Sequence, residues 1–388
     1  MDVEKFIENQ CEEIKHAVGS NKALIACSGG VDSTTCAVLA HKAIGDNLQC
    51  VFIDTGFMRL GEPQKVKSFF NSLGLPFKIV DAKKRFIDAQ KGLVDAEEKR
   101  KNFRSNFYDV LSETAKVEGC KFLVQGTIAP DWIETKGGIK SQHNVLDQIG
   151  INPVEKYGFK VIEPLVNLYK DQVRGVAIGL GIRMDISHRQ PFPGPGLLVR
   201  VVGEVREDKL DIEKRVTRIA EKHLEGSQYF AATMDDEEEE VENNIREITS
   251  EFFKIKPDQI RVKVLKNFVT GVKGDLRAYK RLATLSVVSD SGLFKPDIEK
   301  LVGLQVEIIS KNPDFTRVAY SLTEKPRKGI YIILLRSVET RDFMTANVRK
   351  IPWEVLIKTA EEIMEECKEV SEVYYDVTPK PPATVEYE

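Results

Sequence analysis

The segment Ser28–Ser33, Ser-Gly-Gly-Val-Asp-Ser, constrains the fold more than any other part of this 388-residue chain. A short apolar run, residues 22–27, precedes it, and the small and apolar residues 34–44 follow it. This order predicts a buried strand, a tight loop and a helix. Backbone N–H groups of such a loop and the N-terminus of the helix bind phosphate groups. The sequence therefore predicts a nucleotide-phosphate site at this loop.

Asp32 adds a cation to this prediction. A carboxylate would repel a bare phosphate, but it can hold a Mg²⁺ ion that bridges phosphate oxygens. The loop lacks the Gly-Lys-Ser/Thr ending of a Walker loop, so a different class of nucleotide site is expected. A plain glycine-rich turn is the alternative interpretation.

Strand and helix signals alternate through the first half of the chain, which predicts an α/β domain: a parallel twisted sheet with helices on both faces. From about residue 197 the pattern changes, and we expect a second, α+β domain. The boundaries we expect are residues 1–190 and 191–388. Strands are predicted at residues 48–54, 77–81, 121–125, 259–264, 281–288, 305–309, 317–322, 330–335 and 373–377, and helices at 63–73, 208–223 and 353–366, with another helix opened by the acidic run 235–240.

Composition excludes several function classes. The net charge is −3 and the pI is near 6.1, so no overall positive field favours nucleic acid. No stretch approaches the roughly 18 apolar residues of a membrane span, and the acidic N-terminus is unlike a secretory signal. We expect a cytoplasmic protein without membrane contact. The six cysteines are scattered, which argues against zinc sites and disulfides.

Two irregular segments are candidates for functional loops. Residues 128–152 are rich in Gly, Lys and Asn and have little periodicity, which favours a mobile lid. Residues 189–196, Arg-Gln-Pro-Phe-Pro-Gly-Pro-Gly, cannot form a regular helix or a central strand, so a rigid, specific loop is expected.

The hexapeptide at Ser28 resembles the phosphate loop of N-type ATP pyrophosphatases, which split ATP to AMP and pyrophosphate while adenylating a substrate oxygen. Further segments resemble GMP synthetase and follow in that family's order: residues 125–134, 139–145, 189–200, 271–279, 340–346 and 380–388. The resemblance implies an adenine nucleotide alpha hydrolase-like fold for the first domain. It implies a dimerisation domain for the second, with inserts near residues 225–255 and 289–328 and a C-terminal tail that completes the nucleotide site.

The resemblance also implies roles for individual residues. ATP and Mg²⁺ would be bound by Ser28, Gly29, Gly30, Val31, Asp32 and Ser33, with Gly126 and Thr127 beside the nucleotide and Asp32 as the metal ligand. Catalytic roles fall on Asp131, Glu134, Lys140, His143, Lys170 and Asp171. Substrate would be bound by Arg189, Pro193, Gly194, Lys380, Thr384 and Glu386.

The implied reaction is the conversion of xanthosine monophosphate to GMP. ATP adenylates the 2-oxygen of the substrate, and ammonia then displaces AMP. This chain has no glutaminase nucleophile motif, so the resemblance is to the catalytic subunit of the archaeal two-subunit type. Ammonia would then come from a separate glutaminase subunit, and the chain itself would form a homodimer.

Among the positions that differ from the usual family pattern are Gln142 and Gln190, which stand where His is expected. Gln cannot carry a proton or a charge near neutral pH. A paralogue that adenylates a different oxo-purine therefore remains an alternative, as do a non-catalytic regulatory homologue and a tRNA thiolase. The thiolase would need a sulfur-carrying Cys and a basic RNA-binding face, whereas Cys120 stands alone in an acidic chain.

Overall fold

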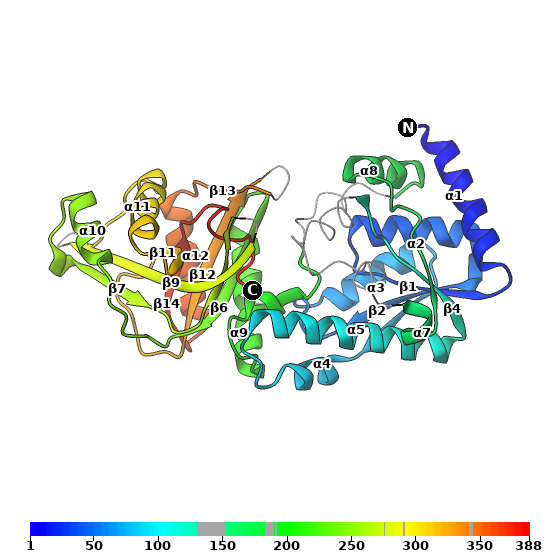
Figure 1. Ribbon diagram of the computed structural model, residues 1–388, viewed down its shortest axis with the longest axis horizontal. Helices are drawn as coiled ribbons and strands as arrows, with labels where there is room; N and C mark the ends of the chain where they lie inside the picture. The colour runs from blue at the N-terminus through cyan, green and yellow to red at the C-terminus, as the bar shows by residue number, and fades with distance from the viewer. Residues whose placement is uncertain (130–151, 183–189, 191, 275, 290–291, 341–343) are drawn as a thin grey trace. The chain divides into compact units, whose positions relative to one another are not determined.

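The computed structural model describes residues 1–129, 152–182, 190, 192–274, 276–289, 292–340 and 344–388. The chain forms two compact units (Figure 1). The N-terminal unit comprises Met1–Ala89 and Arg100–Gly194, and the C-terminal unit comprises Gln90–Lys99 and Pro195–Glu388. Within the described residues, no helix has the length and apolar character needed to span a membrane.

The N-terminal unit is built on a parallel sheet whose described strands follow the order β3-β2-β1-β4-β5. Helices α1, α2 and α8 pack against one another on one side of this sheet, and α4 and α5 lie on the other (Figure 1). The unit contains α1 (Val3–Val18), β1 (Lys22–Ala26), α2 (Val31–Ile44), a 3₁₀ turn (Gly45–Asn47), β2 (Leu48–Asp54), α3 (Glu62–Ser72), β3 (Phe77–Asp81), α4 (Lys83–Gln90), α5 (Ala96–Glu118), β4 (Cys120–Val124), α7 (Pro153–Tyr157), β5 (Lys160–Ile162) and α8 (Lys170–Gly179). The last residue of α4 and the start of α5, residues 96–99, belong to the C-terminal unit.

Burial explains why the central strands are unbroken apolar runs in the sequence. Ala23, Leu24 and Ile25 of β1 are fully buried, because helices cover both faces of a parallel sheet. The chain moves from β1 through β2 to β3 on one side and returns to β4 and β5 on the other. The carboxyl ends of β1 and β4 therefore flank the point where the strand order reverses, which is where open α/β sheets bind ligands.

The C-terminal unit has a mixed sheet whose main path is β10-β9-β11-β14-β12-β13, with β6 pairing with β12, and β7 and β8 with β9, among the described strands. Its elements are a 3₁₀ turn (Gly196–Arg200), α9 (Glu207–His223), β6 (Gln228–Asp235), α10 (Ile245–Phe253), a 3₁₀ turn (Pro257–Gln259), β7 (Ile260–Val264), β8 (Val269–Lys273), β9 (Leu276–Ser289), β10 (Gly292–Leu293), α11 (Ile298–Lys311), β11 (Phe315–Ser321), β12 (Tyr331–Glu339), β13 (Asn347–Val348), α12 (Trp353–Glu366) and β14 (Val370–Asp376).

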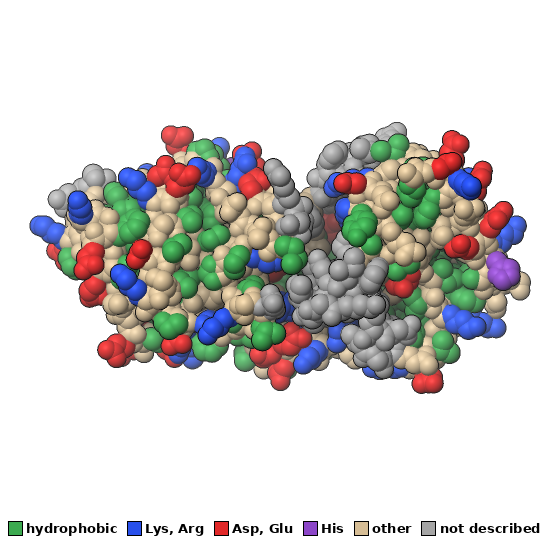
Figure 2. Space-filling model, turned by 45° about the horizontal axis from the view of Figure 1, so that its top comes forward, with side chains coloured by type: hydrophobic (Ala, Val, Ile, Leu, Met, Phe, Trp, Pro, Cys, Tyr) green, Lys and Arg blue, Asp and Glu red, His purple; other side chains and the backbone are tan. Residues whose placement is uncertain are grey.

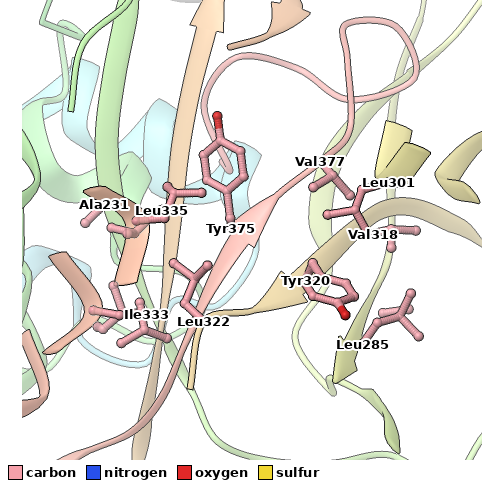
Figure 3. Close-up of a cluster of buried hydrophobic side chains, with 14 of the residues drawn as sticks. Ala231, Leu285, Leu301, Val318, Tyr320, Leu322, Ile333, Leu335, Tyr375 and Val377 are labelled. Carbon is pink, nitrogen blue, oxygen red and sulfur yellow. The ribbon is translucent and has the colours of Figure 1, made fainter. Parts of the chain in front are cut away.

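The two faces of this sheet carry different cores. Ile333 and Leu335 of β12 and Tyr375 of β14 point to the face covered by helices, where the side chains shown in Figure 3 gather. Their neighbours Leu334 and Tyr374 belong to a second cluster, which also contains Tyr387. Because side chains alternate along a strand, one face packs on helices and the other on the end of the chain.

The strand predicted at residues 305–309 is wrong. These residues lie inside α11, where Leu301, Leu304, Gln305 and Ile308 are buried. That spacing is the period of a helix and not of a strand. The short apolar run was ambiguous because four or five residues show either period.

The acidic run 235–240 does not open a helix either. Asp235 ends β6, and α10 begins only at Ile245. Its carboxylates pair with basic side chains of the same unit: Asp235 with Lys209 at 2.7 Å, Asp236 with Lys263 at 2.7 Å, Glu237 with Lys266 at 2.9 Å and Glu239 with Arg281 at 3.1 Å. Acidic and basic side chains are intermixed on the face of this unit seen at the left of Figure 2.

Candidate nucleotide-binding site

Hydrogen bonds of its own two serines fix the conformation of the loop between β1 and α2. The Ser33 hydroxyl donates to Gly30 O at 3.2 Å and lies 3.1 Å from the Ser28 hydroxyl. The backbone N–H of Ser28 donates to Ser33 Oγ at 3.3 Å. Gly29 has φ +79°, and a Cβ there would lie 2.9 Å from Val66 Cγ2, so glycine is required. The first N–H groups of α2 have no intrahelical acceptor and face the loop, as a phosphate site requires.

Asp32 and Lys170 form the charged part of the site. Lys170, the first residue of α8, pairs through its ammonium with Asp32 Oδ2. The other oxygen, Oδ1, is buried and accepts no hydrogen bond from any described residue. A buried carboxylate oxygen without a partner is costly unless a ligand completes it. This oxygen is therefore available to a cation that arrives with the ligand.

The carboxyl end of β4 brings Gly126 and Thr127 to the same place. A Cβ on Gly126 would lie 3.1 Å from both the Asp32 carbonyl carbon and the Ser33 nitrogen, so this glycine packs directly on the start of α2. The Thr127 hydroxyl donates to Glu163 Oε1 at 2.5 Å.

Glu163 was not among the residues predicted from the sequence. It follows β5 directly, at the carboxyl end of a strand, and that position was the signal that could have found it. Burial raises the pKa of the Cys36 thiol, and the negative charges of Asp32 and Glu163 raise it further. Both carboxylates therefore act on the same thiol beneath the phosphate loop. Cys36 itself donates its S–H to Gln125 O at 3.3 Å, and its raised pKa makes it an unreactive core residue.

For the other predicted site residues of this unit that the structure describes, no hydrogen bond or ion pair with the phosphate loop is found. Asp171 is 94% exposed at its side chain and pairs with Arg174 at 3.1 Å, so the structure gives it a surface ion pair. Pro193 and Gly194 follow Phe192, whose ring lies 4.0 Å from the Arg59 guanidinium. Asp131, Glu134, Lys140, Gln142, His143 and Arg189 lie outside the described residues.

No group of three or more His, Cys, Asp or Glu side chains that could hold a metal occurs within the described ranges. A cation at Asp32 would therefore need ligands from the bound nucleotide. This is the usual arrangement for Mg²⁺, which is bound by one or two carboxylates together with substrate phosphates.

The tail, residues 378–388, carries the three substrate residues predicted in the C-terminal unit. The Thr384 hydroxyl donates to Thr270 O at 3.0 Å and accepts from Arg317 Nη2 at 2.9 Å. The Glu386 carboxylate accepts two hydrogen bonds from Arg200, each of 3.0 Å, and a third from Gln228 at 2.6 Å. Lys380 exchanges backbone hydrogen bonds with Ala346.

Two buried arginines hold this tail from inside the unit. Arg317 and Arg336 are fully buried, and each lies 2.8 Å from Asp376 Oδ2. The Tyr387 hydroxyl donates to the same oxygen at 2.8 Å. Burial alone would raise the pKa of Asp376, but Arg336 and Arg317 lower it, so this carboxyl stays charged.

A strand, a Ser-Gly-Gly-Val-Asp-Ser loop and a helix at the switch point of a parallel sheet define the N-terminal unit as a PP-loop domain of an ATP-utilising enzyme. The family model for the PP-loop domain matches residues 3–185, and the model for the GMP synthase C terminal domain matches residues 327–387.

Full-length relatives identify the family. They are the subunits designated B of glutamine-hydrolyzing GMP synthases. The chain is 46% identical to the one from Sulfurisphaera tokodaii, over all of this chain and 99% of the relative. Identities to those from Saccharolobus solfataricus and Pyrococcus horikoshii are 43% and 41%, over the whole length of each chain. This chain belongs to the same GMP synthase family, whose enzymes are ligases that form a C–N bond in GMP biosynthesis.

Among solved structures, the similarity to an NH3-dependent NAD synthetase from Campylobacter jejuni is weak. It covers 48% of this chain and 77% of that one at 18% identity, with a TM-score of 0.38.

Proposed function

We propose that this chain is the catalytic subunit that converts xanthosine monophosphate to GMP with ATP and ammonia. The ring N–H beside C2 loses its proton, and the 2-oxygen of the substrate attacks the α-phosphorus of ATP and forms a new P–O bond. The bond from that phosphorus to the bridging oxygen breaks, and pyrophosphate leaves with the electron pair. Ammonia then adds at C2, loses a proton, and AMP leaves with the former 2-oxygen. The protein positions the reactants and offsets the charge that develops on phosphate.

The free oxygen of Asp32, beside the Lys170 ammonium, is the observation that carries this proposal. Mg²⁺ bound with ATP would neutralise phosphate oxygens and make pyrophosphate a better leaving group. Asp32 Oδ1 is the protein oxygen that would hold it, because it is buried and has no partner among the described residues. Lys170, 45% exposed at its side chain, can turn from Asp32 to a phosphate oxygen.

The tail and the segment around Arg189 are proposed to bind xanthosine monophosphate. Lys380 and Arg189 would neutralise its 5′-phosphate, because cationic groups make strong hydrogen bonds to phosphate. Asp131, Glu134, Lys140, His143 and Asp171 stay proposed as catalytic residues on the resemblance alone. We also propose a homodimer, and a separate glutaminase subunit as the source of ammonia.

The variant Asp32→Asn tests the proposal. It removes the charge that would bind the cation and keeps the shape of the side chain. We expect the rate of AMP and pyrophosphate release with xanthosine monophosphate, ATP, Mg²⁺ and ammonium to fall on the order of 100-fold or more. Asp88→Asn, at a surface pair with Lys84, serves as the control and should leave the rate unchanged. Equal rates in both variants would remove Asp32 from the mechanism.

A further inference from the structure

The tail has little regular structure of its own and is held in place mainly by side chains of the C-terminal unit. Arg317 Nη2 donates to the Thr384 carbonyl at 2.9 Å and to the Glu386 carbonyl at 2.5 Å. Arg336 donates to the carbonyls of Thr384 and Val385, each at 2.9 Å. These contacts fix the middle of the tail. At its end, the Glu388 backbone N–H donates to Val199 O at 3.2 Å, and the Glu388 side chain pairs with a different cation.

That cation is Lys99, which comes from the segment Gln90–Lys99 that packs within the C-terminal unit. Its ammonium forms an ion pair with the Glu388 side chain and donates to Val201 O at 2.8 Å and to Gly203 O at 2.9 Å. Both side chains are at most 3% exposed. Three acceptors match the three N–H donors of an ammonium group, so Lys99 is satisfied at this site.

Glu388 is held equally firmly. Its other carboxylate oxygen accepts from the backbone N–H of Gly203 at 2.7 Å. Burial raises the pKa of Glu388, and the charge of Lys99 and the hydrogen bonds to Lys99 and Gly203 work against that rise, as does the nearby Lys209. Gly203 has φ +80°, a conformation that places its N–H and its C=O within reach of both partners.

A second set of contacts fixes the segment that carries Lys99. The backbone N–H of Gly92 donates to Glu204 Oε1 at 3.2 Å, and Glu97 pairs with Arg277 at 3.5 Å. The Tyr279 hydroxyl also donates to Glu97 at 3.4 Å. Lys99 is therefore presented by an anchored segment and not by a free loop.

A buried ion pair contributes little net stability, since the two charges lose their hydration, but removing one partner is strongly destabilising because the other charge is then left buried without compensation. We propose that Lys99 is a positioning residue of the xanthosine monophosphate site. Through Glu388 it sets the register of the tail and so the positions of Lys380 and Glu386. The inference rests on the proposed function, in which the tail binds xanthosine monophosphate. Lys99 is 1% exposed at its side chain, so in this proposal it acts through Glu388.

The variant Lys99→Met tests the inference, because it should change KM for xanthosine monophosphate but not KM for ATP. The variant leaves the Glu388 carboxylate buried without its cation, so this side chain no longer fixes the end of the tail, which keeps its backbone hydrogen bonds to Val199 and Thr270. We expect KM for xanthosine monophosphate to rise about 10-fold or more, a change worth about 1.4 kcal/mol per factor of ten. KM for ATP should stay within about twofold, because the phosphate loop is untouched. The double variant Lys99→Met with Glu388→Gln should recover part of the affinity, since neither partner is then charged.

Glu372→Gln is the matched control. Glu372 is 1% exposed at its side chain, and its carboxylate pairs with Lys263 at 3.0 Å and with Arg261, away from the tail. The substitution should lower the melting temperature without changing KM for xanthosine monophosphate. Should Lys99→Met fail to fold, Glu388→Asp answers the same question, because it keeps the charge but shortens the reach to Lys99.

The inference about the tail is overturned if KM for xanthosine monophosphate is unchanged in Lys99→Met, or in Glu388→Asp where that variant is used instead. This holds provided that the wild-type chain turns over xanthosine monophosphate, and the proposed function is then unaffected. A wild-type chain that releases no AMP with xanthosine monophosphate would instead overturn the proposed function. The two failures are therefore distinguishable in one set of measurements.

Discussion

Gly126 packs on the backbone that begins the phosphate loop helix. The variant Gly126→Ala would place a methyl group 3.1 Å from backbone atoms of Asp32 and Ser33, which cannot move without shifting the loop. We expect kcat/KM for ATP to fall by at most on the order of 100-fold, which is the cost of displacing a binding group by about 1 Å. Steady-state kinetics with varied ATP measure this.

Gly175→Ala is the control for Gly126→Ala. The nearest atom to a new Cβ there is Val3 Cγ2 at 3.9 Å, an ordinary contact, and the residue lies in α8. Alanine is also the better helix former. If Gly126→Ala behaves like Gly175→Ala, the close approach of β4 to the loop is not needed for ATP use.

Glu213 gives the C-terminal unit a pH dependence. This fully buried side chain accepts hydrogen bonds from Thr217 at 2.7 Å and Thr233 at 2.8 Å. Burial raises its pKa from 4.5 to about 8. The folded chain then binds a proton that the unfolded chain releases above its ordinary pKa, so this contribution to stability is lost as pH rises from about 4.5 to 8.

The variant Glu213→Gln removes the titrating carboxyl group and tests its effect on the pH dependence of stability. The free energy of unfolding should then lose less with rising pH than in the wild-type chain, by at most about 1.4 kcal/mol per pH unit. Urea unfolding at several pH values between 5 and 8 measures the two slopes, and parallel slopes would show that Glu213 ionises normally.

Helix α11 occupies residues for which the sequence predicted a strand, and two substitutions separate the helix from the strand. Leu304 is buried on the helix, whereas Val306 is 55% exposed. In a strand these residues, two apart, would share a face. We expect Leu304→Ala to cost about 2–5 kcal/mol and Val306→Ala less than about 0.5 kcal/mol. Similar losses in both variants, measured by urea unfolding, would favour the strand.

Elements with a strong local pattern were predictable from sequence. The strand before Ser28 and helix α12 carry apolar residues at clear periods, and α12 was predicted with its observed bounds, Trp353–Glu366. Residues 305–309 were too few to show a period. Glu163 was missed because its significance depends on Thr127, which follows a different strand, β4.

At the scale of the whole molecule, ion pairs between residues distant in sequence are the hardest contacts to predict from the sequence. Lys99 and Glu388 are 289 residues apart, and neither has a motif that points to the other. The same holds for Arg317, Arg336 and Asp376, which are charged residues in the interior of the C-terminal unit. Charged residues are rarely buried, so an interpretation by residue type places them at the surface. Family resemblance found the tail as a functional segment but not what holds it.

The source of nitrogen distinguishes one subunit from a complete amidotransferase. With ammonium present, we expect the isolated chain to form GMP from xanthosine monophosphate and ATP. With glutamine as the only nitrogen source, GMP should stay at background, because the glutaminase step belongs to a separate subunit in this proposal. Chromatography of the nucleotides measures both, and equal rates with glutamine would place a glutaminase activity in this chain.

The central claim, that ATP activates the 2-oxygen of xanthosine monophosphate, is tested most directly by following that oxygen. Substrate labelled with ¹⁸O at this position is incubated with the chain, ATP, Mg²⁺ and ammonium, and the products are analysed by mass spectrometry. We predict that the label appears in the phosphate of AMP and is absent from pyrophosphate. Label found in pyrophosphate, or AMP formed without label, would contradict the account.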